Sequence, residues 1–125
     1  MQASEVKMRL AYLADKIGAQ VLTNRDKAAR VDIERAYAGD RMSNLLSEGS
    51  ETTLLVTNLS NAMLPRVAEL VDAAGLCLLN GLPPEPEMVR AAEERGIVLM
   101  VSPVSMFETC GRLYQCLDGG RSATR

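Results

Sequence analysis

Polar side chains that could bind a ligand gather in three short segments, each lying between an apolar run and a helical pattern. The segments are residues 57–61, 80–83 and 102–105, and their candidate ligand-binding residues are Thr57, Asn58, Ser60, Asn61, Asn80, Gly81 and Ser102. Where a parallel strand ends and a helix begins, unpaired backbone N–H groups face the same way and favour an anion. The same residue types also cap helices and form turns, so a structural role stays open at each segment.

Asp40 is a further candidate, because it follows Gly39 and precedes Arg41 at the start of a short helical pattern. An aspartate at this position either accepts hydrogen bonds from the first N–H groups of the helix or contacts a ligand. The sequence leaves both interpretations open, a helix cap and a site residue.

Nucleophilic and metal chemistry has little support in the residue types. Histidine is absent, which removes His-based nucleophiles, His metal ligands and imidazole pH switches. Cys77, Cys110 and Cys116 are an odd number without a C-x-x-C pair, which favours a reduced, cytoplasmic location. Cys110 and Cys116 project about 240° apart on a helix and cannot close a compact metal site. We expect all three cysteines to serve as small, buried apolar side chains. The alternatives are a cysteine cluster shared across an oligomer and a cysteine thiolate activated by Arg112.

Neither glycine motif that binds phosphate, G-x-x-x-x-G-K-[ST] or G-x-G-x-x-G, occurs in the chain. The sequence therefore predicts no catalytic residue, no metal and no cofactor.

Composition and charge are those of one ordinary globular domain. The chain has 125 residues, of which 47% are hydrophobic and 24% charged, and its net charge is -2. This balance gives no electrostatic reason to expect nucleic acid or an anionic membrane as a partner. No segment approaches the roughly 20 apolar residues that span a bilayer. We expect a single domain over residues 1–118 and a flexible tail over residues 119–125, which are rich in Gly, Ser and Arg.

Hydrophobic periodicity predicts alternating helices and strands. Helices are expected at residues 4–17, 42–46, 63–74, 85–95 and 105–117, and strands at 19–23, 31–37, 52–57, 76–79 and 97–101. The charged residues 24–30 are expected to form a solvated loop. The second half repeats strand, polar loop and helix three times, which favours parallel strands joined by right-handed crossovers. The predicted fold class is α/β with a mostly parallel sheet of about five strands.

Four segments of the chain resemble the DRTGG domain family. They are YAGDRMSNLLSEG at residues 37–49, TLLVTN at 53–58, the run from AAGLCLLNGLPPEPE to GIVLMVS at 73–102, and SMFETCGRLYQ at 105–115. The resemblance covers residues 31–117 and implies a three-layer α/β sandwich similar to the N-terminal domain of HPr kinase. The letters DRTGG do not occur as a string, and residues 58–61 replace the charged or glycine residues that relatives place after the central strand. The resemblance makes Arg66, one helical turn later, the candidate to take the place of the missing arginine.

The resemblance implies a regulatory role. Relatives lie beside CBS domains in family II pyrophosphatases and in phosphotransacetylases, where they contribute to dimer contacts and lack catalysis of their own. Stand-alone versions are found near iron-only hydrogenase and electron-transfer genes in anaerobes. Our first hypothesis is a non-catalytic regulatory or accessory module that acts as a homodimer or on a partner enzyme. The alternative is a sensor that binds a small anionic metabolite or nucleotide at the strand ends, and an enzyme is the third hypothesis.

Overall fold

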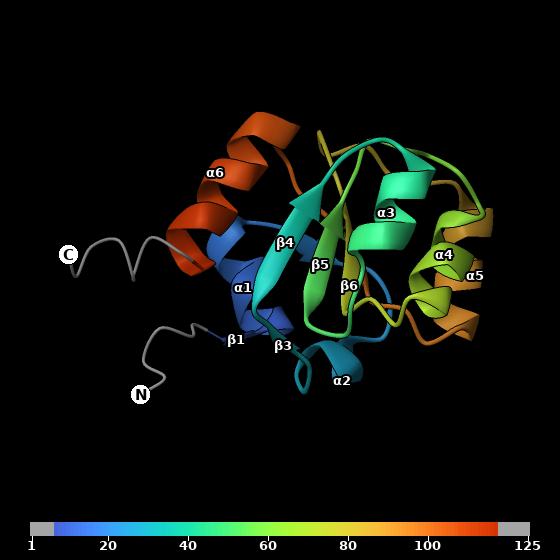
Figure 1. Cartoon of the computed structure of the whole chain (residues 1–125), viewed down its shortest axis with the longest axis horizontal. Helices are drawn as coiled ribbons and strands as arrows, with labels where there is room; N and C mark the ends of the chain where they lie inside the picture. Colours follow the sequence, from blue (N-terminus) through green and yellow to red (C-terminus); the bar gives the residue numbers. More distant parts are fainter. Residues whose placement is uncertain (1–6, 118–125) are drawn as a thin grey trace.

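Strands and helices alternate along most of the chain (Figure 1). The computed structural model describes residues 7–117. The elements are β1 Met8–Arg9, α1 Leu10–Ile17, β2 Gln20–Val21, α2 Arg25–Ala28, β3 Asp32–Ile33, β4 Arg35–Ala38, α3 Met42–Glu48, β5 Thr53–Val56, α4 Leu64–Leu70, β6 Gly75–Leu78, α5 Pro86–Glu94, β7 Leu99–Val101 and α6 Met106–Leu117.

Five of the strands form one sheet in the order β2, β7, β6, β5, β4. The four strands from β4 to β7 are parallel, and β2 runs antiparallel to β7 at one edge. Leu55 of β5 is in register with Tyr37 of β4 on one side and with Leu76 of β6 on the other. The predicted mostly parallel, five-stranded sheet is confirmed, and the carboxyl ends of β4 to β7 lie at the same edge.

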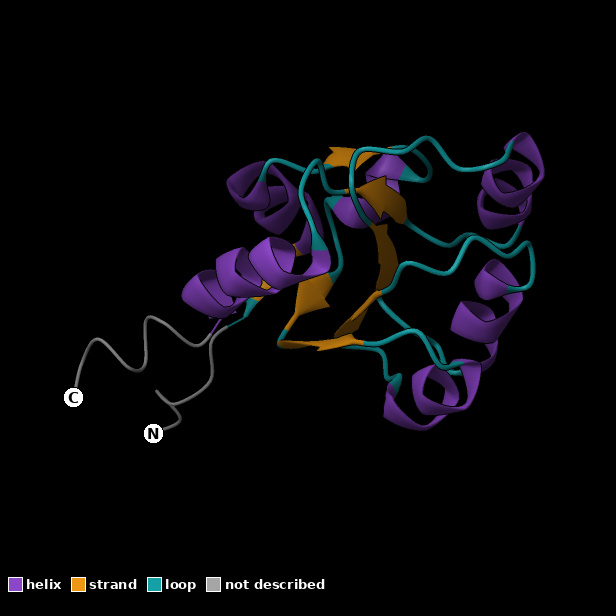
Figure 2. Cartoon of the chain, turned by 90° about the horizontal axis from the view of Figure 1, so that it is seen from above, coloured by secondary structure: helices purple, strands orange, loops and turns teal. Residues whose placement is uncertain are grey.

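Helices cover both faces of this sheet and produce three layers (Figure 2). Successive side chains of a strand point to opposite faces. Leu54 and Val56 therefore join the core beneath α1 and α6, whereas Leu55 joins the core beneath α3, α4 and α5. Because β5 and β6 are buried on both faces, their sequences are continuously apolar rather than alternating.

The N-terminal third departs from the sequence prediction in several places. Residues 24–30 are not a solvated loop, since α2 lies there and buries Ala28 completely. The strand expected at 19–23 is only β2, because Thr23 leaves the ladder: its hydroxyl donates to the carbonyl of Ile97 at 2.6 Å and accepts the N–H of Leu99 at 2.9 Å. These contacts cross more than 70 residues of chain, so no local pattern could indicate them.

Three further elements have boundaries that differ from the prediction. The strand expected at 31–37 is divided between β3, which pairs with β1, and β4, which pairs with β5. The first helix begins at Leu10 because Met8 and Arg9 form β1, and the expected cap Ser4 lies outside the described residues. The helix expected at 63–74 ends at Leu70, since Asp72 has a φ of 58° and turns the chain into β6.

Within residues 7–117, every fully buried side-chain nitrogen or oxygen has a hydrogen-bond partner. In the same range, none of the helices combines the length and apolar character that a bilayer crossing needs.

Candidate functional site

Residues at the carboxyl ends of β4, β5 and β6 are linked by hydrogen bonds. The Thr57 hydroxyl donates to Asp40 Oδ1 at 3.0 Å, and the Asn58 backbone N–H donates to the same oxygen at 2.7 Å. The Asn58 amide nitrogen lies 3.4 Å from Asp40 Oδ2, and the Asn80 amide donates to Asn58 Oδ1 at 3.3 Å. We call Asp40, Thr57, Asn58 and Asn80 the strand-end cluster. It joins three strands through side chains that lie up to 40 residues apart in sequence.

Asp40 belongs to this cluster and does not cap α3, the other role that the sequence left open. The residue that precedes α3 is Arg41, and no side chain caps the helix. The backbone N–H of Asn58, and then the Thr57 hydroxyl and the Asn58 amide, hold the pKa of Asp40 below its usual value against the opposing effect of partial burial. The carboxylate is therefore ionised at neutral pH. It also occupies donors of residues 57 and 58 that an anion would otherwise use.

A pocket of about 160 Å³ lies beside the cluster, between the loops that follow β5 and β6. Its lining consists of Thr57, Asn58, Leu59, Ser60, Leu78, Leu79, Asn80, Leu82, Pro83 and Pro84. None of these side chains is charged, and aliphatic groups alternate with amides and hydroxyls. Such a lining matches a flat, uncharged ring whose edge carries both donors and acceptors.

The backbone around Asn80 and Gly81 gives the pocket its shape. The backbone of both residues is in the left-handed conformation, with φ values of 62° and 64°. Asparagine and glycine adopt this conformation most readily. The N–H of Asn80 donates to the carbonyl of Val104 at 2.9 Å, and that of Gly81 to the carbonyl of Ser102 at 2.8 Å. These two bonds close the gap between the loops after β6 and β7.

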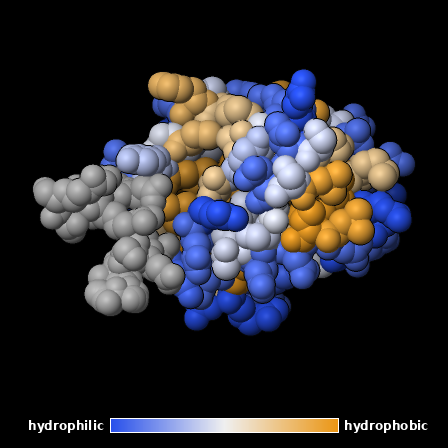
Figure 3. Space-filling view, viewed as in Figure 1, coloured by the Kyte–Doolittle hydropathy of each residue, from blue (hydrophilic) through white to orange (hydrophobic). Residues whose placement is uncertain are grey.

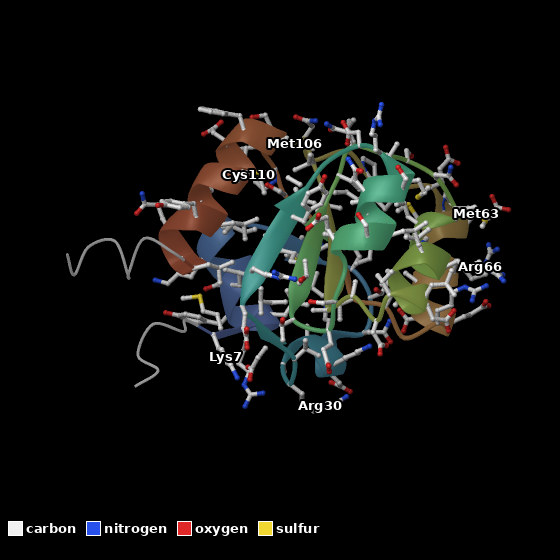
Figure 4. The ribbon with its side chains drawn as sticks, viewed as in Figure 1. Lys7, Arg30, Met63, Arg66, Met106 and Cys110 are labelled. Atoms are coloured by element: carbon white, nitrogen blue, oxygen red, sulfur yellow. The ribbon has the colours of Figure 1, made fainter. Side chains whose placement is uncertain are left out.

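Of the remaining predicted residues, one lines this pocket and the others have contacts elsewhere. Ser60 lines the pocket, whereas the side-chain oxygen of Asn61 accepts the N–H of Met63 at 2.8 Å, just before α4. Ser102 is fully buried, and its hydroxyl lies 2.7 Å from that of Thr109 in α6. Arg66 is exposed and projects from α4 to the side of the molecule, away from the strand ends (Figure 4).

The apolar half of the pocket was absent from the sequence prediction. Leu59, Leu82, Pro83 and Pro84 supply it, and Leu82 keeps 67% of its surface exposed. The available signal was a leucine followed by two prolines in an otherwise polar loop.

The cysteines differ in burial. Cys77 is buried at the centre of the sheet, and burial raises its pKa to about 12. Cys110 is half-buried, and burial raises its pKa as well. Arg112 donates to the carbonyl of Ile17 at 2.7 Å, at the end of α1. Among residues 7–117, no three Cys, Asp or Glu side chains gather closely enough to hold a metal ion.

The fold alone places the chain in a structural class, the DRTGG-like three-layer α/β domains. The chain is similar to the crystal structure of the CBS and DRTGG domains of the regulatory region of Clostridium perfringens pyrophosphatase, complexed with the activator diadenosine tetraphosphate. The TM-score is 0.68 with 16% identity over 88% of this chain. The match covers 48% of the other chain, so this chain spans about half its length. The DRTGG-like fold expected from the sequence is confirmed.

No family model matches the sequence, and no curated protein matches it. The TM-score of 0.68 shows a common fold, and an identity of 16% carries no residue roles from one chain to the other.

Proposed function

We propose that this chain is a regulatory module that senses a nucleotide by binding its purine ring in the strand-end pocket. The observation that carries the proposal is the pocket itself: uncharged, half aliphatic, and edged by the amides of Asn58 and Asn80. The similar fold of a regulatory region crystallised with diadenosine tetraphosphate supports the same ligand class.

The size of the pocket limits how much of a nucleotide it takes. Its volume of about 160 Å³ is below the roughly 300–1,000 Å³ of sites that enclose a drug-sized ligand. One ring system fits, and the sugar and phosphates stay outside. With about ten enclosed ring atoms, we expect a Kd of roughly 0.1–1 mM for a nucleoside.

The negative charge of the strand-end cluster disfavours an anion at the site where the sequence predicted one. Asp40 is ionised and its hydrogen bonds use the donors of Thr57 and Asn58. A phosphate placed there would meet a carboxylate, and the pocket lining offers no Lys or Arg. Recognition therefore depends on the ring and not on the phosphate.

The first test compares ligands by the rise in melting temperature, since a ligand that binds only the folded state stabilises it. We expect adenosine, AMP and ATP at millimolar concentration to give equal shifts, and inorganic phosphate or pyrophosphate to give none. A shift with phosphate and none with adenosine would show that the ring is not what is recognised.

The second test removes the two halves of the pocket separately. Asn80→Gly deletes an amide and keeps the left-handed conformation, and Leu82→Ala deletes an exposed aliphatic group. We expect each to weaken adenosine binding at least about fivefold, because each removes roughly 1 kcal/mol of contact. Leu70→Ala, an equally exposed leucine on α4, is the matched control. Equal affinity in all four proteins would contradict the proposal.

This function involves no turnover. Burial raises the thiol pKa of Cys77 and Cys110, and Arg112 is directed to α1, so the thiolate route has no support in the geometry. Association with a partner enzyme, including hydrogenase or electron-transfer enzymes, stays a prediction. Contact with a second copy of the chain also stays a prediction.

A further inference from the structure

The hydrogen bonds of the strand-end cluster all run in one direction, toward Asp40. An ionised carboxylate can only accept hydrogen bonds. Its Oδ1 accepts from the Thr57 hydroxyl at 3.0 Å and from the Asn58 backbone N–H at 2.7 Å. Its Oδ2 lies 3.4 Å from the Asn58 side-chain nitrogen, and the oxygen of that amide could not take the nitrogen's place there, since two acceptors repel. The charge of Asp40 therefore fixes the orientation of the Asn58 amide.

The orientation of the Asn80 amide follows from that of Asn58. Because the Asn58 nitrogen lies at Asp40, the Asn58 oxygen is left for the next side chain, and the Asn80 nitrogen donates to it at 3.3 Å. The side-chain oxygen of Asn80 accepts no hydrogen bond from residues 7–117. Asn80 is exposed and lines the pocket. With its nitrogen held toward Asn58, the end of the amide that lies farther from the cluster is an acceptor.

The other side-chain oxygens that line the pocket do not favour one kind of ring edge. The Thr57 hydroxyl donates to Asp40 and accepts the N–H of Leu59 at 3.1 Å, so it is used in both directions. The Asn58 oxygen accepts from Asn80, and the Ser60 hydroxyl can rotate to donate or to accept. Among these oxygens of the described chain, that of Asn80 is thus free and can only accept.

Apolar contact cannot distinguish one purine from another in this pocket. The aliphatic wall of leucines and prolines attracts any flat ring, because the hydrophobic effect has no direction. The two broad apolar areas of the face drawn in Figure 3 lie over the groove between α6 and β4 and over α3 and α4, away from the strand ends. Selection among rings in the pocket therefore depends on its hydrogen-bonding groups.

We propose that the strand-end pocket selects adenine over purines with an oxygen at C6, and that Asp40 sets this selectivity as a positioning residue acting through Asn58 and Asn80. The inference rests on the proposed function, in which a purine ring occupies the pocket. Adenine carries an amino group at C6, which is a donor, and a 6-oxopurine carries an acceptor there. The Asn80 oxygen accepts a hydrogen bond from the amino group, whereas it meets the carbonyl oxygen of a 6-oxopurine without a proton between them.

The substitution Asp40→Asn reverses the chain of hydrogen bonds at almost unchanged shape. The oxygen of the new side chain keeps the place of Oδ1, since the Thr57 hydroxyl and the Asn58 N–H both donate to that place. Its nitrogen then takes the place of Oδ2 and donates to the Asn58 oxygen. The Asn58 nitrogen turns to Asn80, whose oxygen accepts from it. The free end of the Asn80 amide becomes a donor, which suits the oxygen of a 6-oxopurine.

NMR titrations with adenosine and with inosine, a 6-oxopurine nucleoside, measure the selectivity. We expect wild type to bind adenosine at least about fivefold more tightly than inosine, and Asp40→Asn to show the opposite preference by a similar factor. Asn80→Gly should bind both nucleosides equally, because it removes the amide that distinguishes them. Two controls should keep the wild-type ratio of affinities. Asp15→Asn removes the same charge from the exposed side of α1, and Leu82→Ala weakens both nucleosides by the same factor.

Equal affinities of wild type for the two nucleosides overturn the inference, and so does an Asp40→Asn protein that keeps the preference for adenosine. If the melting curve shows that Asp40→Asn is unfolded, Asn80→Gly decides: a preference that survives this change comes from other groups and overturns the inference. Wild type that binds both nucleosides equally leaves the proposed function intact, since the ring is still recognised. Wild type that binds neither nucleoside rejects the proposed function and this inference with it.

Discussion

Asp40 is the residue on which the geometry of the strand ends depends. Its single carboxylate accepts hydrogen bonds from Thr57 and from the backbone of Asn58, and the Asn58 side chain then contacts Asn80. A neutral side chain of smaller size would leave the loop after β5 without its link to β4. The pocket is preorganised by this charge, although the charge does not line it.

Replacing Asp40 by alanine should lower the free energy of unfolding by about 1 kcal/mol at pH 7, the net value of exposed hydrogen bonds to a charged group after solvent screening. The pKa of Asp40 is lowered in the folded chain from a usual value of 3.8. Its stabilising effect is therefore fully present above that value and is lost as the pH falls through the lower folded pKa. Urea unfolding at several pH values measures the difference between wild type and variant.

The control for this prediction is Asp15→Ala, which removes an exposed carboxylate from α1. We expect the Asp40 difference to shrink below about pH 4, whereas the control changes stability little at any pH. If the difference in free energy of unfolding between wild type and Asp40→Ala stays constant down to pH 2, the ionised form of Asp40 does not stabilise the cluster.

At the level of elements, the contact between α3 and α4 depends on Gly49. A Cβ built on this residue would lie 2.3 Å from Val71 Cγ2 and 3.2 Å from the carbonyl of Leu45. The φ of Gly49 is -72°, so the backbone does not require glycine there. Because Gly49 has no side chain, α3 and α4 can approach each other closely.

Gly49→Ala should destabilise the protein by about 1–3 kcal/mol, the usual cost of overpacking a filled contact. The double variant Gly49→Ala with Val71→Ala should recover part of that loss, because it removes the methyl group that the new Cβ meets. Denaturant unfolding of the four proteins gives the coupling energy. If the effects of the two substitutions on the free energy of unfolding simply add, contact with Val71 is not the cause of the lost stability.

At the level of the whole molecule, Cys77 reports on global unfolding. It lies in a central strand with no exposed surface, and burial raises its pKa to about 12. In a variant with Cys110→Ser and Cys116→Ser, alkylation of Cys77 requires opening of the sheet between two helical layers. We expect the free energy obtained from its protection against alkylation to equal that from urea unfolding, within about 1 kcal/mol. A much faster reaction would reveal local opening beside β6.

The sequence by itself determined the fold class, and in the second half of the chain the three strand-and-helix repeats and their polar loops. These features follow from local periodicity and from turn residues, which each segment carries regardless of its neighbours. Only the tertiary structure decided that Asp40 contacts Asn58, that Thr23 bonds to Ile97 and Leu99, and that Ser102 faces Thr109. Each of the first two joins residues from different strands or loops, and the third depends on where α6 packs. The order of strands then fixed which edge stays open, because pairing across a sheet is a property of the assembled chain and of no single segment.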